Sequence, residues 1–67
     1  MNKFSERLQN LLNTEKISQN KLAKHLNVKQ QTISRYILNI NQPNFDILIK
    51  IARFFDVTTD YLLGLED

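Results

Sequence analysis

Apolar residues recur every three or four positions along most of the chain, the spacing that gathers them on one face of an α-helix. The first such stripe predicts a helix over about residues 3–14 and consists of Phe4, Leu8, Leu11 and Leu12. The same spacing predicts four more helices, over about residues 19–26, 30–38, 45–55 and 59–63. One glycine and one proline in 67 residues are few helix breakers. The pattern therefore indicates an all-α chain with short turns.

Short polar side chains mark the ends of the predicted helices. Those that can accept a hydrogen bond from a free backbone N–H at a helix start are Asn2, Ser18, Asn44 and Thr58. Those that can take the left-handed conformation ending a helix are Asn27, Asn39 and Gly64. We therefore expect each helix to begin or end at one of these residues.

The fourth predicted helix is apolar around most of its circumference. Its main stripe consists of Phe45, Leu48, Ile51, Ala52 and Phe55, which Ile47, Ile49 and Phe54 widen. Such breadth predicts a helix that is close to buried. The aromatic side chains expected in the core are Tyr36, Phe45, Phe54, Phe55 and Tyr61.

Residues 18–38 have the layout of a helix-turn-helix, two short helices joined by a tight turn. Ala23 falls where the helices would cross, and its small side chain permits close approach. The packing residues around the turn are expected to be Leu22, Leu26, Val28 and Ile33. The exposed start of the second helix then offers Gln30, Gln31, Thr32, Ser34 and Arg35.

The charge distribution is uneven. Residues 16–44 contain five basic residues and no acidic one, whereas residues 45–67 carry a net charge of −3 and the whole chain +2. A wholly basic segment between neutral and acidic flanks suits a polyanion, although a solvated surface with uneven charge would look the same.

These side-chain types suit the reading of duplex DNA. A Gln can pair bidentately with adenine and an Arg with guanine in the major groove, while Ser and Thr are less specific. The backbone N–H groups at Gln19 and Asn20, with the helix dipole, form a phosphate site. Lys21 and Lys29 can add charge to the backbone contact.

The segment SQNKLAKHLNVKQQTISRYILN, residues 18–39, resembles the helix-turn-helix of the phage repressor and Cro family, the XRE-like transcriptional regulators. The later stretches FDILIKIARFF and VTTDYLLG extend the resemblance over about residues 4–64. It implies a compact, five-helix, lambda-repressor-like DNA-binding domain occupying residues 1–67. It also implies a cytoplasmic transcriptional regulator, expected to be a repressor, that binds a near-palindromic double-stranded operator as a homodimer.

The resemblance implies roles for individual residues. Its base-contact positions are those of Gln30, Gln31 and Arg35, with Thr32 and Ser34 as further candidates. Its DNA-backbone positions are those of Ser18, Gln19, Lys29, Asn39 and Asn41. The dimer surface is expected on the fifth helix and the C-terminal tail.

Two departures from the family pattern bear on packing and partners. Many relatives have an Arg at the position of Leu12 and an acid at that of Ile37, which form a buried ion pair; here both are apolar, and we expect them to pack together. Leu38 and Ile40 replace polar residues that often touch phosphate. They could instead join a dimer contact or bind a protein partner.

Other classes of function find little support. The chain has no Cys, and His25 has no evident carboxylate partner, so no catalytic site, metal or cofactor is expected. No run of 18 apolar residues could span a membrane. The alternative that stays open is a protein-interaction module, such as an antitoxin or a phage antirepressor, which would use Leu38 and Ile40 or the acidic C-terminal tail.

Overall fold

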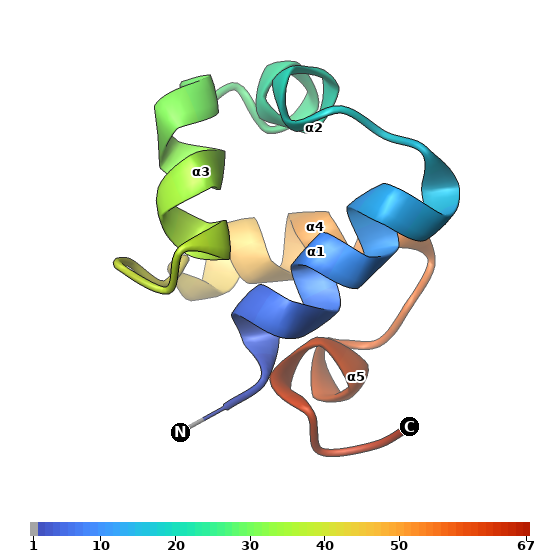
Figure 1. The fold of residues 1–67 in the computed structure, drawn as a ribbon. Coiled ribbons are helices and arrows are strands. Elements are labelled where there is room, and N and C mark those ends of the chain that lie inside the picture. Colours follow the sequence, from blue (N-terminus) through green and yellow to red (C-terminus); the bar gives the residue numbers. More distant parts are fainter. Residues whose placement is uncertain (1) are drawn as a thin grey trace.

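Five α-helices surround one apolar core in the computed structural model, which describes residues 2–67, and no strand forms within that range (Figure 1). The helices are α1 (Phe4–Glu15), α2 (Gln19–Leu26), α3 (Gln30–Ile37), α4 (Phe45–Phe55) and α5 (Thr59–Leu63). The prediction of an all-α, five-helix chain is confirmed, with the expected bounds for α2, α4 and α5. The first helix is displaced by one residue from its prediction, and α3 ends one residue earlier.

Polar side chains cap the helix starts as predicted. The side chains of Ser18, Asn44 and Thr58 each accept a hydrogen bond of 2.9–3.0 Å from the backbone N–H three residues later. Asn2 Oδ1 accepts from the Phe4 N–H at 3.0 Å. Each bond satisfies a donor that the helix cannot satisfy itself, which is why these residues determine where the helices begin.

Left-handed residues follow the helices. Asn27, Asn39 and Gly64 have φ values of 58°, 61° and 79°, as expected from their types. Lys16 and Asp56 adopt the same conformation after α1 and α4, with φ values of 57° and 56°. The sequence pattern did not indicate these two residues as left-handed.

Every helix contributes to the core. The side chains that are at most 2% exposed and largest in volume are Phe4, Leu8, Leu22, Ile33, Ile51 and Leu62. No charged or polar residue is buried within the described part of the chain. Leu12 is buried, and Ile37 is half-buried against the same cluster. Both positions are therefore apolar packing sites; their direct contact stays a prediction.

The fourth helix is less buried than its composition predicts. Phe45 is 83% exposed and Ile49 is 41% exposed, while Phe54 and Phe55 are half-buried. The expectation that Phe45 belongs to the core is therefore wrong. Phe45 is the first residue of α4, and a small helical protein has too little interior to cover every side of an apolar helix.

The start of α1 and the segment after α5 both lie on the side of the molecule away from α2 (Figure 1). The Lys3 N–H lies 3.4 Å from the Leu63 carbonyl oxygen. The Arg7 guanidinium lies 4.4 Å from the centre of the Tyr61 ring and donates to the Glu66 carbonyl at 3.2 Å. These contacts hold α5 against α1 and leave α2 and the start of α3 uncovered.

Candidate nucleic-acid interface

The α2–turn–α3 unit is the best-defined element of the candidate site. Three residues, Asn27–Lys29, join the helices, and the Val28 N–H donates to the Ala23 carbonyl at 3.0 Å to close the turn. Ala23 is 2% exposed, in line with the small side chain expected where the helices cross. In Figure 1, α2 is seen nearly end-on while α3 runs in the plane of the view, so the two helices cross steeply. This is the geometry of a helix-turn-helix.

The outer face of α3 presents the three leading candidates for base contact. Gln30, Gln31 and Arg35 are exposed, whereas Ile33 and Tyr36 on the opposite face are buried. Packing through Ile33 and Tyr36 anchors the helix and leaves the amides and the guanidinium free to meet a ligand. A helix held in this way can enter a major groove without losing its own packing.

The Ser34 hydroxyl donates to Gln19 Oε1 at 2.6 Å. This bond joins the middle of α3 to the first residue of α2, and both side chains are half-buried. Sequence reasoning placed Ser34 among the base contacts and Gln19 among the phosphate contacts. The structure brings the two together, so the Ser34 proton is engaged within the protein and the Gln19 amide is held against α3.

The N-terminus of α2 lies beside α3. The first backbone N–H groups of α2, at Gln19 and Asn20, have no acceptor within the helix. The Ser18 hydroxyl oxygen accepts a hydrogen bond from the Lys21 N–H, so Ser18 caps the helix. Asn20, Lys21 and Lys29 are exposed, whereas Thr32 on α3 is half-buried.

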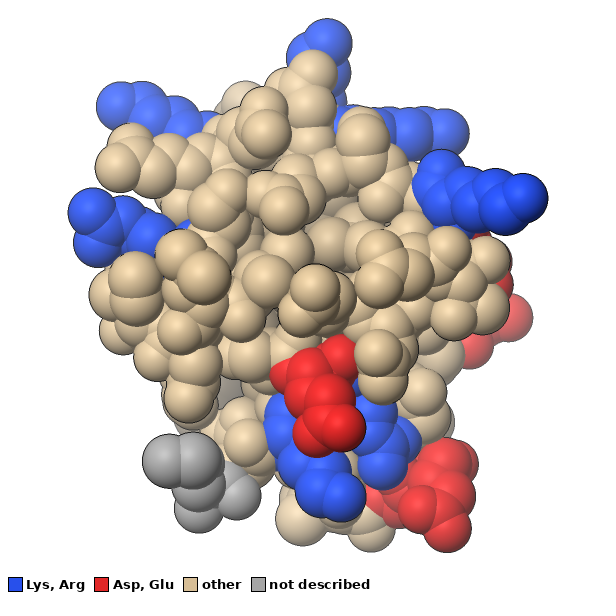
Figure 2. Space-filling model, viewed as in Figure 1, with Lys and Arg blue, Asp and Glu red and all other residues tan. Residues whose placement is uncertain are grey.

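Positive charge gathers around this unit. Figure 2 shows basic and no acidic side chains along the upper edge of the molecule, where α2 and the start of α3 lie in Figure 1. In the same view, acidic side chains appear only from the level of α1 downward. The basic side chains along this edge, with no acidic one beside them in this view, suit binding to a polyanion.

The loop after α3 is tied to α1 by a residue that sequence reasoning missed. The Ser5 hydroxyl donates to the Tyr36 carbonyl at 2.6 Å and lies 3.3 Å from Asn39 Oδ1. No local pattern could have indicated Ser5, because its partners are 31 and 34 residues away. Asn39 and Asn41 are exposed, and Leu38 and Ile40 are 68% and 59% exposed.

The single histidine and the acidic side chains are the other residues that could bind a metal ion. His25 is exposed, and its ring centre lies 4.6 Å from that of Phe54. Residues 2–67 contain no group of three His, Cys, Asp or Glu side chains placed to hold a metal ion. None of the helices in that range combines the length and the apolar character needed to cross a membrane.

The fold and this face define a helix-turn-helix DNA-binding domain. Residues 8–62 match the family model HTH_3, Helix-turn-helix. The chain belongs to this family of XRE-type transcriptional regulators, which are not enzymes.

Similar proteins of known description are bacterial and phage regulators. The chain is 38% identical over 64 residues to the HTH-type transcriptional activator BcrR of Enterococcus faecalis, covering 96% of this chain and 31% of that protein. A transcriptional regulator from Listeria innocua has a TM-score of 0.93 and 27% identity, covering 100% of this chain and 63% of that one. The P22 c2 repressor, solved with synthetic operator 9T, has a TM-score of 0.87 and 27% identity, covering 94% and 96%.

These matches confirm the predicted lambda-repressor-like fold and the resemblance to phage repressors. The chain spans between 31% and 57% of the length of the curated relatives that it matches.

Proposed function

We propose that the protein regulates transcription by binding a specific double-stranded DNA sequence through α3, and that it acts as a repressor in the cytoplasm. The observation that carries the proposal is the exposed row of Gln30, Gln31 and Arg35 on a helix whose opposite face is buried. The similar P22 c2 repressor has been solved in complex with a synthetic operator, which supports DNA binding by this chain. Residues 1–67 form the DNA-binding domain of this regulator.

Base recognition is assigned to the start of α3. Each Gln side chain can donate to and accept from adenine, and Arg35 can donate twice to guanine. Thr32 and Ser34 contribute less, since Thr32 is half-buried and the Ser34 hydroxyl is bonded to Gln19. Specificity therefore rests mainly on Gln30, Gln31 and Arg35.

DNA-backbone contacts are assigned to the elements around that helix. The free N–H groups and dipole at the start of α2 attract a phosphate. Lys21 and Lys29 add point charges, whose effect falls with salt. The further candidates are Ser18, Gln19, Asn20, Asn39 and Asn41.

The operator is proposed to be a near-palindrome bound by two copies of the protein. Each copy has one α3 helix for base recognition, and a two-fold axis places the two α3 helices about one helical turn of DNA apart.

Selection of bound sites from random duplex DNA tests the proposal. The expected result is a palindromic consensus. Gln31→Ala should then weaken binding to that consensus by about 1–3 kcal/mol and relax one base position in each half-site. Gln9→Ala, which removes an exposed amide from α1, is the matched control and should bind as wild type does. No enrichment of any sequence, or equal losses on random DNA, would refute sequence-specific reading.

A second candidate function is a protein-interaction module, such as an antitoxin or an antirepressor. Leu38 and Ile40, both more than half exposed in the loop after α3, favour it. Proteins that copurify with the wild type and with Leu38→Lys/Ile40→Lys should be compared. A partner bound by the wild type alone, with operator affinity unchanged, would support this function. Loss of operator affinity in the variant would instead assign the loop to DNA.

A further inference from the structure

A hydrogen bond between two half-buried side chains ties α3 to α2 within the candidate interface. The Ser34 hydroxyl donates to Gln19 Oε1 at 2.6 Å. A serine inside a helix can otherwise bond to the carbonyl oxygen one turn earlier on the same helix. Here it reaches across to the first residue of the neighbouring helix, 15 residues away in the chain. The bond therefore depends on the close approach of the two helices.

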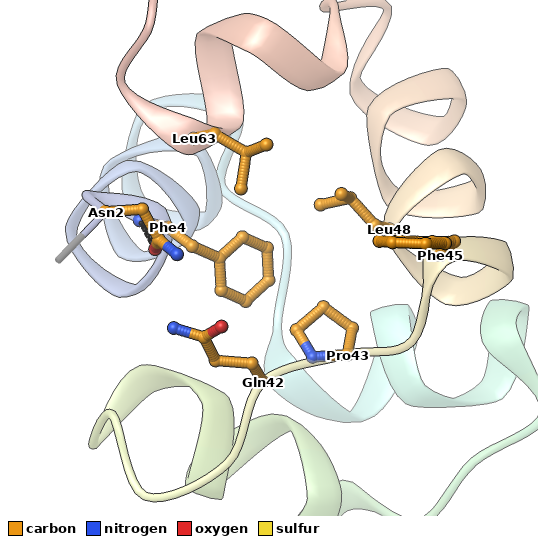
Figure 3. A pocket seen from close by; sticks show the side chains of 7 residues that line it. All are labelled: Asn2, Phe4, Gln42, Pro43, Phe45, Leu48 and Leu63. Carbon is orange, nitrogen blue, oxygen red and sulfur yellow. Dashed lines mark hydrogen bonds between the residues drawn. The ribbon is translucent and has the colours of Figure 1, made fainter.

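Other glutamine side chains are not held in this way. Among the glutamines that the structure describes, Gln19 alone forms a hydrogen bond to another side chain. Gln9, Gln30 and Gln31 are exposed on their helices. Gln42 lies at the edge of a pocket of about 240 Å³ between α1, α4 and α5, where its amide makes no hydrogen bond to the other residues that line the pocket (Figure 3). The fixed amide of Gln19 is thus a particular feature of the contact between α2 and α3.

The length of the bond indicates which end of the Gln19 amide faces Ser34. A separation of 2.6 Å is typical of O–H···O bonds and is shorter than the roughly 2.7–3.2 Å of N–H···O bonds. The amide oxygen therefore accepts from the hydroxyl, and the Nε2 group keeps both of its N–H donors. The backbone N–H groups of Gln19 and Asn20 are also free at this helix end. The start of α2 thus offers several hydrogen-bond donors together.

We propose that Ser34 is a positioning residue, which turns the Gln19 amide so that Nε2 donates to a phosphate of the DNA backbone. This inference rests on the proposed function, and it gives Ser34 a role other than the base contact expected from the sequence. A phosphate oxygen accepts hydrogen bonds and donates none, so it matches a group of donors. The edges of the bases carry donors as well as acceptors and match this group less well.

The bond also couples the phosphate contact to base recognition. Ser34 lies on α3 between Gln31 and Arg35, two of the residues assigned to base contacts. Phosphate contacts fix the register and orientation of a protein on the duplex. Because the Gln19 amide is joined to α3, a phosphate bound by α2 also fixes the placement of α3. A free Gln19 side chain would have to be ordered on binding, which lowers the affinity by about three- to tenfold.

The mobility of the Gln19 amide tests the hydrogen bond without DNA. In ¹⁵N relaxation measurements on the 67-residue chain, the Nε2 group of Gln19 should be ordered, whereas that of the exposed Gln9 should be mobile. In Ser34→Ala, the Gln19 group should become as mobile as that of Gln9. A Gln19 amide that is mobile in the wild type, or equally ordered in Ser34→Ala, would overturn the inference.

A double-mutant cycle of DNA affinities tests the role of the bond. On the selected consensus, Ser34→Ala should bind about three- to tenfold more weakly than the wild type, and by the same factor on duplexes with single base changes. The double variant Gln19→Ala/Ser34→Ala should bind no more weakly than Gln19→Ala alone. Thr14→Ala, which removes an exposed hydroxyl from α1, is the control and should bind as wild type does. A changed preference at one base position in Ser34→Ala, or losses that simply add in the double variant, would refute the positioning role.

Exchanging the amide for a carboxylate tests which end of the Gln19 side chain meets the DNA. Gln19→Glu keeps an oxygen that can accept from Ser34, but it replaces the N–H donors by an anionic oxygen. It should bind DNA more weakly than Gln19→Ala does, while its melting temperature should not fall, because an acid in the first turn suits the helix dipole. Gln9→Glu adds the same charge to α1 and should lose less affinity. Equal losses in the two glutamate variants would contradict a contact at Nε2.

Neutralising single phosphates separates this inference from the proposed function. Each phosphate of the selected consensus is replaced in turn by an uncharged methylphosphonate. One position in each half-site should cost the wild type more affinity than it costs Ser34→Ala. If the wild type selects a consensus but no such position exists, the positioning role of Ser34 fails while sequence-specific binding stands. If the wild type binds no duplex DNA, the proposed function and this inference both fail.

Discussion

Replacing Leu12 by Arg tests whether this chain has exchanged a buried ion pair for apolar packing. Leu12 is 5% exposed and belongs to the core cluster, against which Ile37 packs. In Leu12→Arg, a guanidinium would have to leave water without a carboxylate to receive it. An unpaired buried charge costs about 3–5 kcal/mol.

This loss is large for so small a protein. At about 0.05–0.15 kcal/mol per residue, a 67-residue chain has a free energy of unfolding of roughly 3–10 kcal/mol. Each kcal/mol lowers the melting temperature of a domain of this size by about 4–8 °C. The melting temperature of Leu12→Arg should therefore fall by about 12 °C or more, and part of the population should be unfolded at room temperature.

Thermal unfolding followed by circular dichroism at 222 nm is the assay. Asn13→Arg, an exposed neighbour on the same helix, is the control and should melt close to the wild type. The double variant Leu12→Arg/Ile37→Glu adds a carboxylate that can pair with the guanidinium, so its melting temperature should lie above that of Leu12→Arg. If the double variant is as unstable as the sum of the two single variants, the two side chains do not meet. A melting temperature of Leu12→Arg equal to that of the wild type would refute the argument that this position is closed to charge.

Three further predictions concern DNA binding, backbone conformation and pH. Lys29→Ala should weaken binding to all duplexes similarly and reduce the slope of log affinity against log salt by about one, whereas Lys50→Ala, on exposed α4 surface, should leave the slope unchanged. Lys16→Gly should raise stability by about 1 kcal/mol in thermal melts, because φ is 57° there; an unchanged or lower melting temperature would show that Lys16 is not strained. Burial raises the pKa of Tyr36 above its ordinary value of 10.0. The neutral phenol therefore contributes to the free energy of unfolding below about pH 10, and this contribution is lost as the pH rises further. Unfolding free energies measured between pH 9 and 11 should therefore fall less steeply in Tyr36→Phe, and equal slopes would contradict this assignment.

The candidate interface was only partly predictable. The exposure of Gln30, Gln31 and Arg35 follows from the phase of the apolar stripe on α3, since a 3.6-residue period that buries Ile33 and Tyr36 leaves the other face outside. The bond between Ser34 and Gln19 does not follow from that phase. It depends on how closely α2 and α3 approach each other.

The sequence by itself determined where the helices lie and which of their faces are apolar. Caps such as Ser18 and Thr58 act on a backbone group only three residues away, so chain connectivity is enough to predict them. Tertiary structure decided which apolar residues are covered. Phe45 belongs to the same stripe as the buried Ile51, yet it lies beyond the reach of its neighbours and remains exposed. Burial depends on where other helices end, and that distance is set by the packing of the whole chain rather than by any local pattern.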